Sequence, residues 1–217
     1  MPLSHGHQRV LLINAGIMLV LATIALWLGR WPIAFVAIAT FGLSLVPVIV
    51  AETFAIKLPM PFLIATSLFT IASVFLGEAF DFYERVWWWD LALHGSSAIG
   101  FGLIGFLFVF MLFDGDRFAA PPAALGVLAF TVAITVGSIW EIFEYVMDLV
   151  FGLNMQKSGV NDVMTDLILN ALGAAFAGFS GYLYLKNAGT HVFRTLIEDF
   201  IRLNKDFYRK SRDRFRR

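Results

Sequence analysis

The chain has 217 residues, of which 59% are hydrophobic, 16% are aromatic and only 15% are charged. This composition excludes ordinary water-soluble proteins, and the absence of cysteine excludes disulfide scaffolds, thiolate metal sites and iron-sulfur clusters. The charge is balanced, with 16 Lys and Arg against 16 Asp and Glu, so the total indicates neither a nucleic-acid partner nor an acidic substrate.

Six apolar segments are each long enough to cross a bilayer, which takes about 20 residues. They cover residues 10–28, 32–50, 58–77, 91–113, 122–142 and 163–185. None of them alternates between apolar and polar residues as a barrel strand does, so helices are favoured. We therefore predict an all-α, polytopic membrane protein with a six-helix transmembrane domain over residues 1–189.

The first segment is expected to be a retained helix rather than a secretory signal, because its apolar run is long and only Arg9 precedes it. The sequence Gly29-Arg30-Trp31-Pro32 then predicts a sharp turn, since Gly suits the end of one helix and Pro the first turn of the next. The first two helices should be antiparallel neighbours.

Basic residues are distributed unevenly over the two sides that six spans define. Only Arg30, Arg85 and Lys157 fall opposite the termini, whereas the other Lys and Arg share the side of the termini. The positive-inside rule then predicts a multi-pass protein of the bacterial inner membrane with both termini cytoplasmic. The segment 190–217 mixes basic and apolar residues at helical spacing, which predicts either an amphipathic helix on anionic lipid or a solvated basic tail.

Acidic residues gather at the outer ends of the last three spans, where they form one polar stripe per helix. The stripes are Asp90 and His94; Glu141, Glu144 and Asp148; and Asp162, Asp166 and Asn170. Residues three or four apart share a helix face, so the stripes can converge on one partly desolvated cluster. Because basic partners are scarce, such a cluster must take up protons or metal cations.

Carboxylates with one imidazole and no sulfur suit a divalent Mg, Mn, Ca or Zn ion, which is the cofactor we predict. Structural roles compete with this interpretation. Asp90 and Asp162 are placed to cap their helices, and Glu141 and Glu144 can face solvent. His94 alone would most often be a satisfied helix histidine. Asp166 and Asn170 lie too deep to be caps.

The stretches WWWDLALHGSSAIGFGLIGF and GSIWEIFEYVMDLVFGLNMQKSGVNDVMTDLILNALGA resemble the YjdF-like family of bacterial integral membrane proteins. The resemblance covers residues 78–182 and implies a membrane protein with no established activity. By position it implies the motif residues Asp90, His94, Trp140, Glu141, Glu144, Asp148, Gln156, Asp162, Asp166 and Asn170. Val163 and Met164 depart from the family, which often has Thr and Met after the first Asp of this helix.

Three functions remain open at this stage. The first is an enzyme in which the bound metal activates water against a lipid head group or another envelope substrate. The second is a cation- or proton-coupled transporter, and the third is a non-catalytic protein that uses the cluster to lock its helices together. Membrane lipids are the expected partners, and a small-molecule substrate is an alternative.

Small residues at Gly173, Ala177 and Gly181 predict close packing of the fourth span against the sixth.

Overall fold

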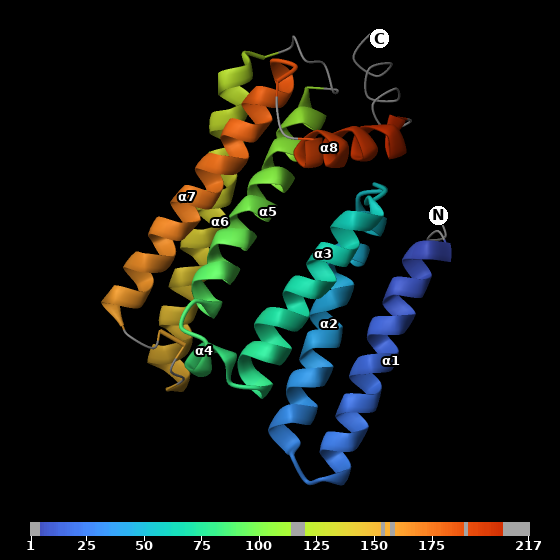
Figure 1. The fold of residues 1–217 in the computed structure, drawn as a ribbon, viewed down its shortest axis with the longest axis vertical. Helices are drawn as coiled ribbons and strands as arrows, with labels where there is room; N and C mark the ends of the chain where they lie inside the picture. The colour runs from blue at the N-terminus through green and yellow to red at the C-terminus, as the bar shows by residue number, and fades with distance from the viewer. Residues whose placement is uncertain (1–4, 114–119, 153–154, 157–158, 189–190, 206–217) are drawn as a thin grey trace. The chain divides into compact units, whose positions relative to one another are not determined.

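The computed structural model describes residues 5–113, 120–152, 155–156, 159–188 and 191–205. The predicted all-α fold is confirmed: helices make up nearly all of these residues, and the described ranges contain no strand (Figure 1). The helices are α1 (His5–Trp27), α2 (Trp31–Thr53), α3 (Met60–Thr70), a π-helical segment (Ile71–Ala79), α4 (Phe82–Arg85), α5 (Trp89–Leu112), α6 (Pro122–Phe151), α7 (Val160–Leu185) and α8 (His191–Leu203).

Five of the described helical segments are long and apolar enough to cross a membrane, so the predicted count of six is not confirmed. They cover Ile33–Thr53, Met60–Gly77, Trp89–Leu112, Pro122–Phe151 and Val160–Leu185. Among the residues searched in the first helix, the apolar stretch Ala15–Trp27 is shorter than a membrane span.

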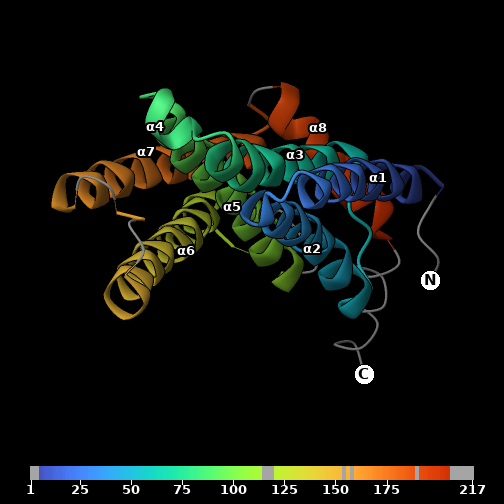
Figure 2. The same cartoon turned by 90° about the horizontal axis from the view of Figure 1, so that it is seen from below.

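The chain divides into two compact units. The first runs to Trp89 and includes the end of α8 from Glu198, whereas the second runs from Asp90 to Ile197. In the first unit, α1, α2 and α3 lie side by side in Figures 1 and 2, around a core formed by Met18, Ala22, Ala37 and Phe75.

The turn between α1 and α2 has the predicted antiparallel form. Gly29 adopts a positive φ of 69°, which an L side chain rarely adopts, and Arg30 N–H donates to the carbonyl of Ala25 at 2.7 Å. Proline in the first turn of α2 costs no hydrogen bond there. The local sequence is therefore sufficient to reverse the chain at this point.

The π-helical segment at the end of α3 is tied to the start of α5 within the first unit. The indole Nε1–H of Trp89 donates to the carbonyl of Ala72 at 3.3 Å, and the Trp89 ring packs edge-on against Phe82. A widened helical turn carries backbone groups out of the regular α-helical ladder, which suits a side-chain hydrogen bond at this position. Trp89 directly precedes Asp90, so this contact anchors the residue from which α5 begins.

The second unit is a bundle of α5, α6 and α7 held together by small residues. A Cβ atom built at Gly173 would lie 2.7 Å from the carbonyl oxygen of Gly95, and one built at Gly102 would collide with Ala177. The predicted close packing of the fourth span (α5) against the sixth (α7) is thus confirmed. Without side chains at these positions the helices approach closely enough for backbone and Cβ atoms to touch.

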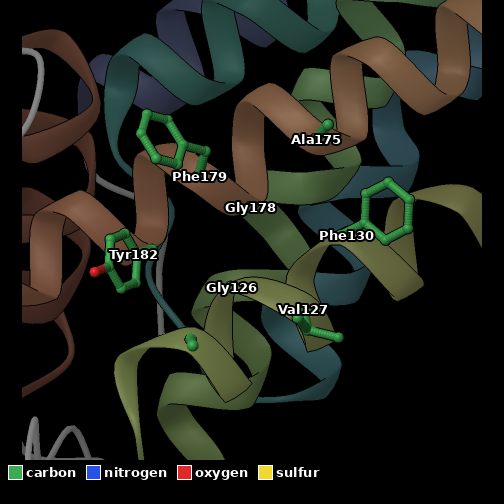
Figure 3. Close-up of a pocket in the computed structure, with 8 residues that line it drawn as sticks. Gly126, Val127, Phe130, Ala175, Gly178, Phe179 and Tyr182 are labelled. Atoms are coloured by element: carbon green, nitrogen blue, oxygen red, sulfur yellow. The ribbon is translucent and has the colours of Figure 1, made fainter.

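The backbones of α6 and α7 are in close contact at Gly126 and Gly178. A shallow apolar groove of about 270 Å³ runs beside this crossing, and Figure 3 shows Phe130, Phe179 and Tyr182 along it. From the crossing, α6 and α7 diverge toward the end where the chain connects them (Figure 2). The acidic stripes lie at that diverging end.

The C-terminal helix α8 places apolar residues on one side, but this side is buried. Phe193, Ile197 and Phe200 are 7%, 0% and 3% exposed, respectively. Asn204 follows the helix, accepts a hydrogen bond from the backbone of Lys57 and donates one back to its carbonyl. An amphipathic helix is therefore present where one was predicted. The rest of the predicted basic tail, residues 206–217, lies outside the described residues.

Candidate functional site

His94 is the centre of the polar cluster, and it lies on the second turn of α5. The side chain of Asp90, one turn earlier on the same helix face, places Oδ1 3.6 Å from His94 Nε2. The His94 residue is 8% exposed, whereas one third of the Asp90 side chain is accessible. The predicted pair of these two residues on one face of α5 is thus present.

Helix α6 contributes Glu141 and Glu144, which face His94 from the other edge of its ring. Glu141 Oε1 lies 3.6 Å from His94 Nδ1. Glu141 is 5% exposed, and neither of its carboxylate oxygens has a hydrogen-bond partner among the described residues. Glu144 is half-buried and offers an oxygen within 4.8 Å of the ligand atoms of His94 and Glu141. A buried carboxylate without partners is costly, so Glu141 requires an explanation.

Helix α7 contributes Asp166 and Asn170 from its inner face. Asp166 Oδ2 lies 3.8 Å from His94 Nε2, and both α7 residues are 2% exposed. The amide Nδ2 of Asn170 is also buried without a hydrogen-bond partner among the described residues. Their deep position confirms that neither residue is merely a helix cap.

Gly137 was not identified from the sequence, yet it provides the space that Asn170 occupies. A Cβ atom built at Gly137 would lie 2.7 Å from Asn170 Nδ2 and 2.8 Å from its Cγ. Gly137 lies one turn before Glu141, and two turns before Glu144, on the same face of α6. The sequence could have identified Gly137 by this spacing. A glycine in line with a stripe of acidic residues indicates a position where a side chain of a neighbouring helix can pack against the helix backbone.

The cluster gathers several acidic groups around one imidazole. Among the described residues, the ion pairs of Glu141 and Asp166 are with His94 alone. Asp90 and Asp162 act electrostatically on Glu141 and Asp166. Asp162 is half-buried in the first turn of α7, and it belongs to neither group of residues whose ligand atoms lie close together. The site therefore has one imidazole and an excess of acidic groups.

Asp148 and Gln156 are placed differently from the other predicted site residues. Both oxygens of Asp148 accept backbone hydrogen bonds after the end of α6, from Met155 N–H at 2.7 Å and Gln156 N–H at 2.9 Å. The Gln156 amide donates to the backbone carbonyl of Glu141 at 3.4 Å. Asp148 thus fixes the connection to α7, and Gln156 supports α6 beside the cluster.

Two groups of three residues have ligand atoms mutually within 4.8 Å in the described part of the chain. One comprises Asp90, His94 and Asp166, and the other comprises His94, Glu141 and Glu144. Both groups share His94 and lie within the second unit. An imidazole with carboxylates on both sides can bind a hard or borderline divalent cation, and the half-buried Glu144 leaves one side of the cluster accessible.

Comparison with known proteins places the chain in a family of membrane proteins. It belongs to the family described as "Predicted membrane protein (DUF2238)", whose match covers residues 9–187 and so includes the entire cluster. The resemblance to YjdF-like membrane proteins is consistent with this membership. An uncharacterized protein of Thermotoga maritima is 30% identical over 133 residues, which cover 59% of this chain and 67% of that protein. No solved structure matches the chain.

Proposed function

We propose that the cluster around His94 binds a divalent cation, with Mg, Mn, Ca and Zn as the candidates. The observation that carries the proposal is the Glu141 carboxylate, which is 5% exposed and has no hydrogen-bond partner at either oxygen within the part of the chain that the structure describes. A carboxylate accepts and never donates when ionised, so its burial beside other acids favours a cation as the partner.

The distances support a shared cation better than direct hydrogen bonds. His94 Nδ1 and Glu141 Oε1 are 3.6 Å apart, farther than a hydrogen bond of about 2.9 Å. Two ligand atoms that each lie about 2.0–2.2 Å from one cation are separated by up to about 4.4 Å. The spacing therefore suits ligands arranged around an ion.

We further propose that the cation serves an enzyme. A bound divalent ion would lower the pKa of a coordinated water and supply a nucleophile at neutral pH, and a carboxylate of the cluster that does not coordinate the ion would receive the proton. The substrate class that suits a site between membrane helices is a lipid head group or another envelope molecule.

Transport is the less favoured function because the acidic residues are confined to one end of the bundle. Helix α5 carries Asp and His only up to His94, α6 carries Glu and Asp only from Glu141, and α7 carries Asp only up to Asp166. An ion crossing the bilayer would need further polar groups along its path.

The cellular placement is part of the proposal. The distribution of Lys and Arg supports a multi-pass protein of the bacterial inner membrane with both termini in the cytoplasm, so that the cluster faces the outer side. Membrane lipids are then the immediate partners of the exposed apolar faces of α6 and α7.

Metal analysis and thermal unfolding of the purified protein test the cation site. We expect a co-purifying divalent metal, and we expect a chelator to lower the melting temperature, because an ion at 100 times its Kd stabilises the folded state by about 2.7 kcal/mol. Glu141→Gln should lose the metal and the response to chelator. The matched control is Glu52→Gln, which alters an exposed acid in α2 and should preserve both.

The proposal fails if the protein contains no metal and none of the four ions raises its melting temperature. Complementation of a deletion strain separates an enzyme from a structural lock. Asp166→Asn should abolish complementation while leaving a folded protein if the site is catalytic, since active sites concentrate like charges at a cost in stability. Parallel loss of folded yield and complementation would instead assign the cluster a structural role.

A further inference from the structure

The two nitrogens of the His94 ring face different sets of carboxylates. Nδ1 faces Glu141 on α6, and Nε2 faces Asp90 on α5 and Asp166 on α7. A neutral imidazole has one nitrogen with a free lone pair and one that carries a hydrogen. A single cation bound to His94 must therefore choose one side of the ring, and the other nitrogen must donate a hydrogen bond.

We propose that the cation lies on the Glu141 and Glu144 side of His94, bound through Nδ1, and that Asp90 and Asp166 receive the hydrogen of Nε2. This inference rests on the proposed cation site and specifies which residues are its ligands. It makes Asp90 and Asp166 positioning residues. They hold the ring and its tautomer, as carboxylates do behind many metal-bound histidines.

The burial of both Glu141 carboxylate oxygens determines which side of the His94 ring we assign to the cation. If the cation lay on the opposite side, Nδ1 would carry the hydrogen and could donate to Oε1 of Glu141, but Oε2 would remain buried without a partner. A cation on the Glu141 side can coordinate either oxygen or both. With both oxygens coordinated, neither oxygen of Glu141 is left without a partner.

The residues on the other side of the ring suit the role of acceptors. Two carboxylates from two helices converge on Nε2, at 3.6 Å for Asp90 and 3.8 Å for Asp166. Either one can accept the hydrogen after a small movement of its side chain. The negative charge behind the ring also makes Nδ1 a more basic ligand.

Cobalt titration of the full-length protein in detergent distinguishes the two sides, because the visible spectrum of bound Co²⁺ reports its direct ligands. We expect Asp90→Asn to retain one Co²⁺ per chain with the wild-type spectrum, and to weaken binding by about 10- to 100-fold. Asn at this position keeps an oxygen that accepts from Nε2–H. Glu144→Gln should change the spectrum or abolish binding.

Glu144→Asp provides a second test if Glu144→Gln does not fold, since it keeps the charge and displaces the ligand oxygen. The assignment is overturned if Asp90→Asn changes the spectrum or abolishes binding, or if the Glu144 variants leave both spectrum and affinity unaltered. A wild-type protein that binds no Co²⁺ or other divalent ion would refute the cation site itself. One that binds the ion with the opposite pattern of effects refutes only the side chosen here.

Discussion

Replacing Gly178 by alanine should destabilise the protein, although alanine favours a helix more than glycine does. The new Cβ atom would lie 2.5 Å from the carbonyl oxygen of Gly126 and 3.3 Å from the Cβ of Phe130. Ordinary contact begins at 3.4 Å, so α6 and α7 must separate locally by about 0.9 Å. The obstructing atom belongs to the backbone of the neighbouring helix and cannot rotate away.

Two opposing effects set the magnitude. Overpacking in a close helix contact costs about 1–3 kcal/mol, and this backbone contact places the cost in the upper part of that range. Exchanging glycine for alanine in a helix gains about 0.5–1 kcal/mol. The net loss is about 1–2 kcal/mol. For a protein of this size, that loss corresponds to a decrease in melting temperature of about 2–8 °C.

The assay is thermal unfolding in detergent, followed by the fluorescence of the six tryptophans. Gly100→Ala in α5 is the matched control, because a Cβ atom there meets nothing within 4 Å. It should keep the helix-propensity gain and raise the melting temperature by about 1–4 °C. If Gly178→Ala raises the melting temperature as much as Gly100→Ala, the close packing of α6 against α7 is not as described.

Two further predictions concern the connection between α6 and α7 and the topology. Asp148→Asn retains one oxygen acceptor but loses the charge that holds the backbone N–H groups of Met155 and Gln156. Hydrogen exchange of these two amides, measured by mass spectrometry, should therefore accelerate about tenfold or more. Unchanged exchange would show that Asp148 does not fix this segment. Reporter fusions at Asp116 and Lys157 should report the cytoplasm and the exterior, respectively, because basic residues are concentrated on the side of the termini. If both fusions report the same compartment, the proposed topology is refuted.

The fold was largely predictable because a membrane span is defined by length and apolarity alone. Gly29 predicted a sharp turn between the first two helices, and Gly173 and Ala177 predicted close helix packing. The structure has both features. Five spans are found among the described residues, so the predicted count of six is not confirmed. The π-helical end of α3 has no distinctive sequence pattern, because it depends on packing and on the hydrogen bond from Trp89.

The site was predictable to the level of helix faces but not of individual contacts. Spacing of three and four residues correctly brought His94 together with Glu141 and Asp166. The same spacing could not separate Asp148 from the others, because its partners are backbone amides in a connection without periodicity. The pocket for Asn170 at Gly137 depends on the relative rotation of two helices, and that rotation is a tertiary property.

Because the polar residues lie near the ends of α5, α6 and α7, each of these helices can be inserted into the membrane as a mostly apolar segment during synthesis. A charged residue at the centre of a span costs about 2.5–3.5 kcal/mol on insertion scales, and a position near the end avoids much of this cost. Because α5 and α6 precede α7 in the chain, His94 and Glu141 are synthesised before Asp166. The cluster is completed only when α7 joins α5 and α6.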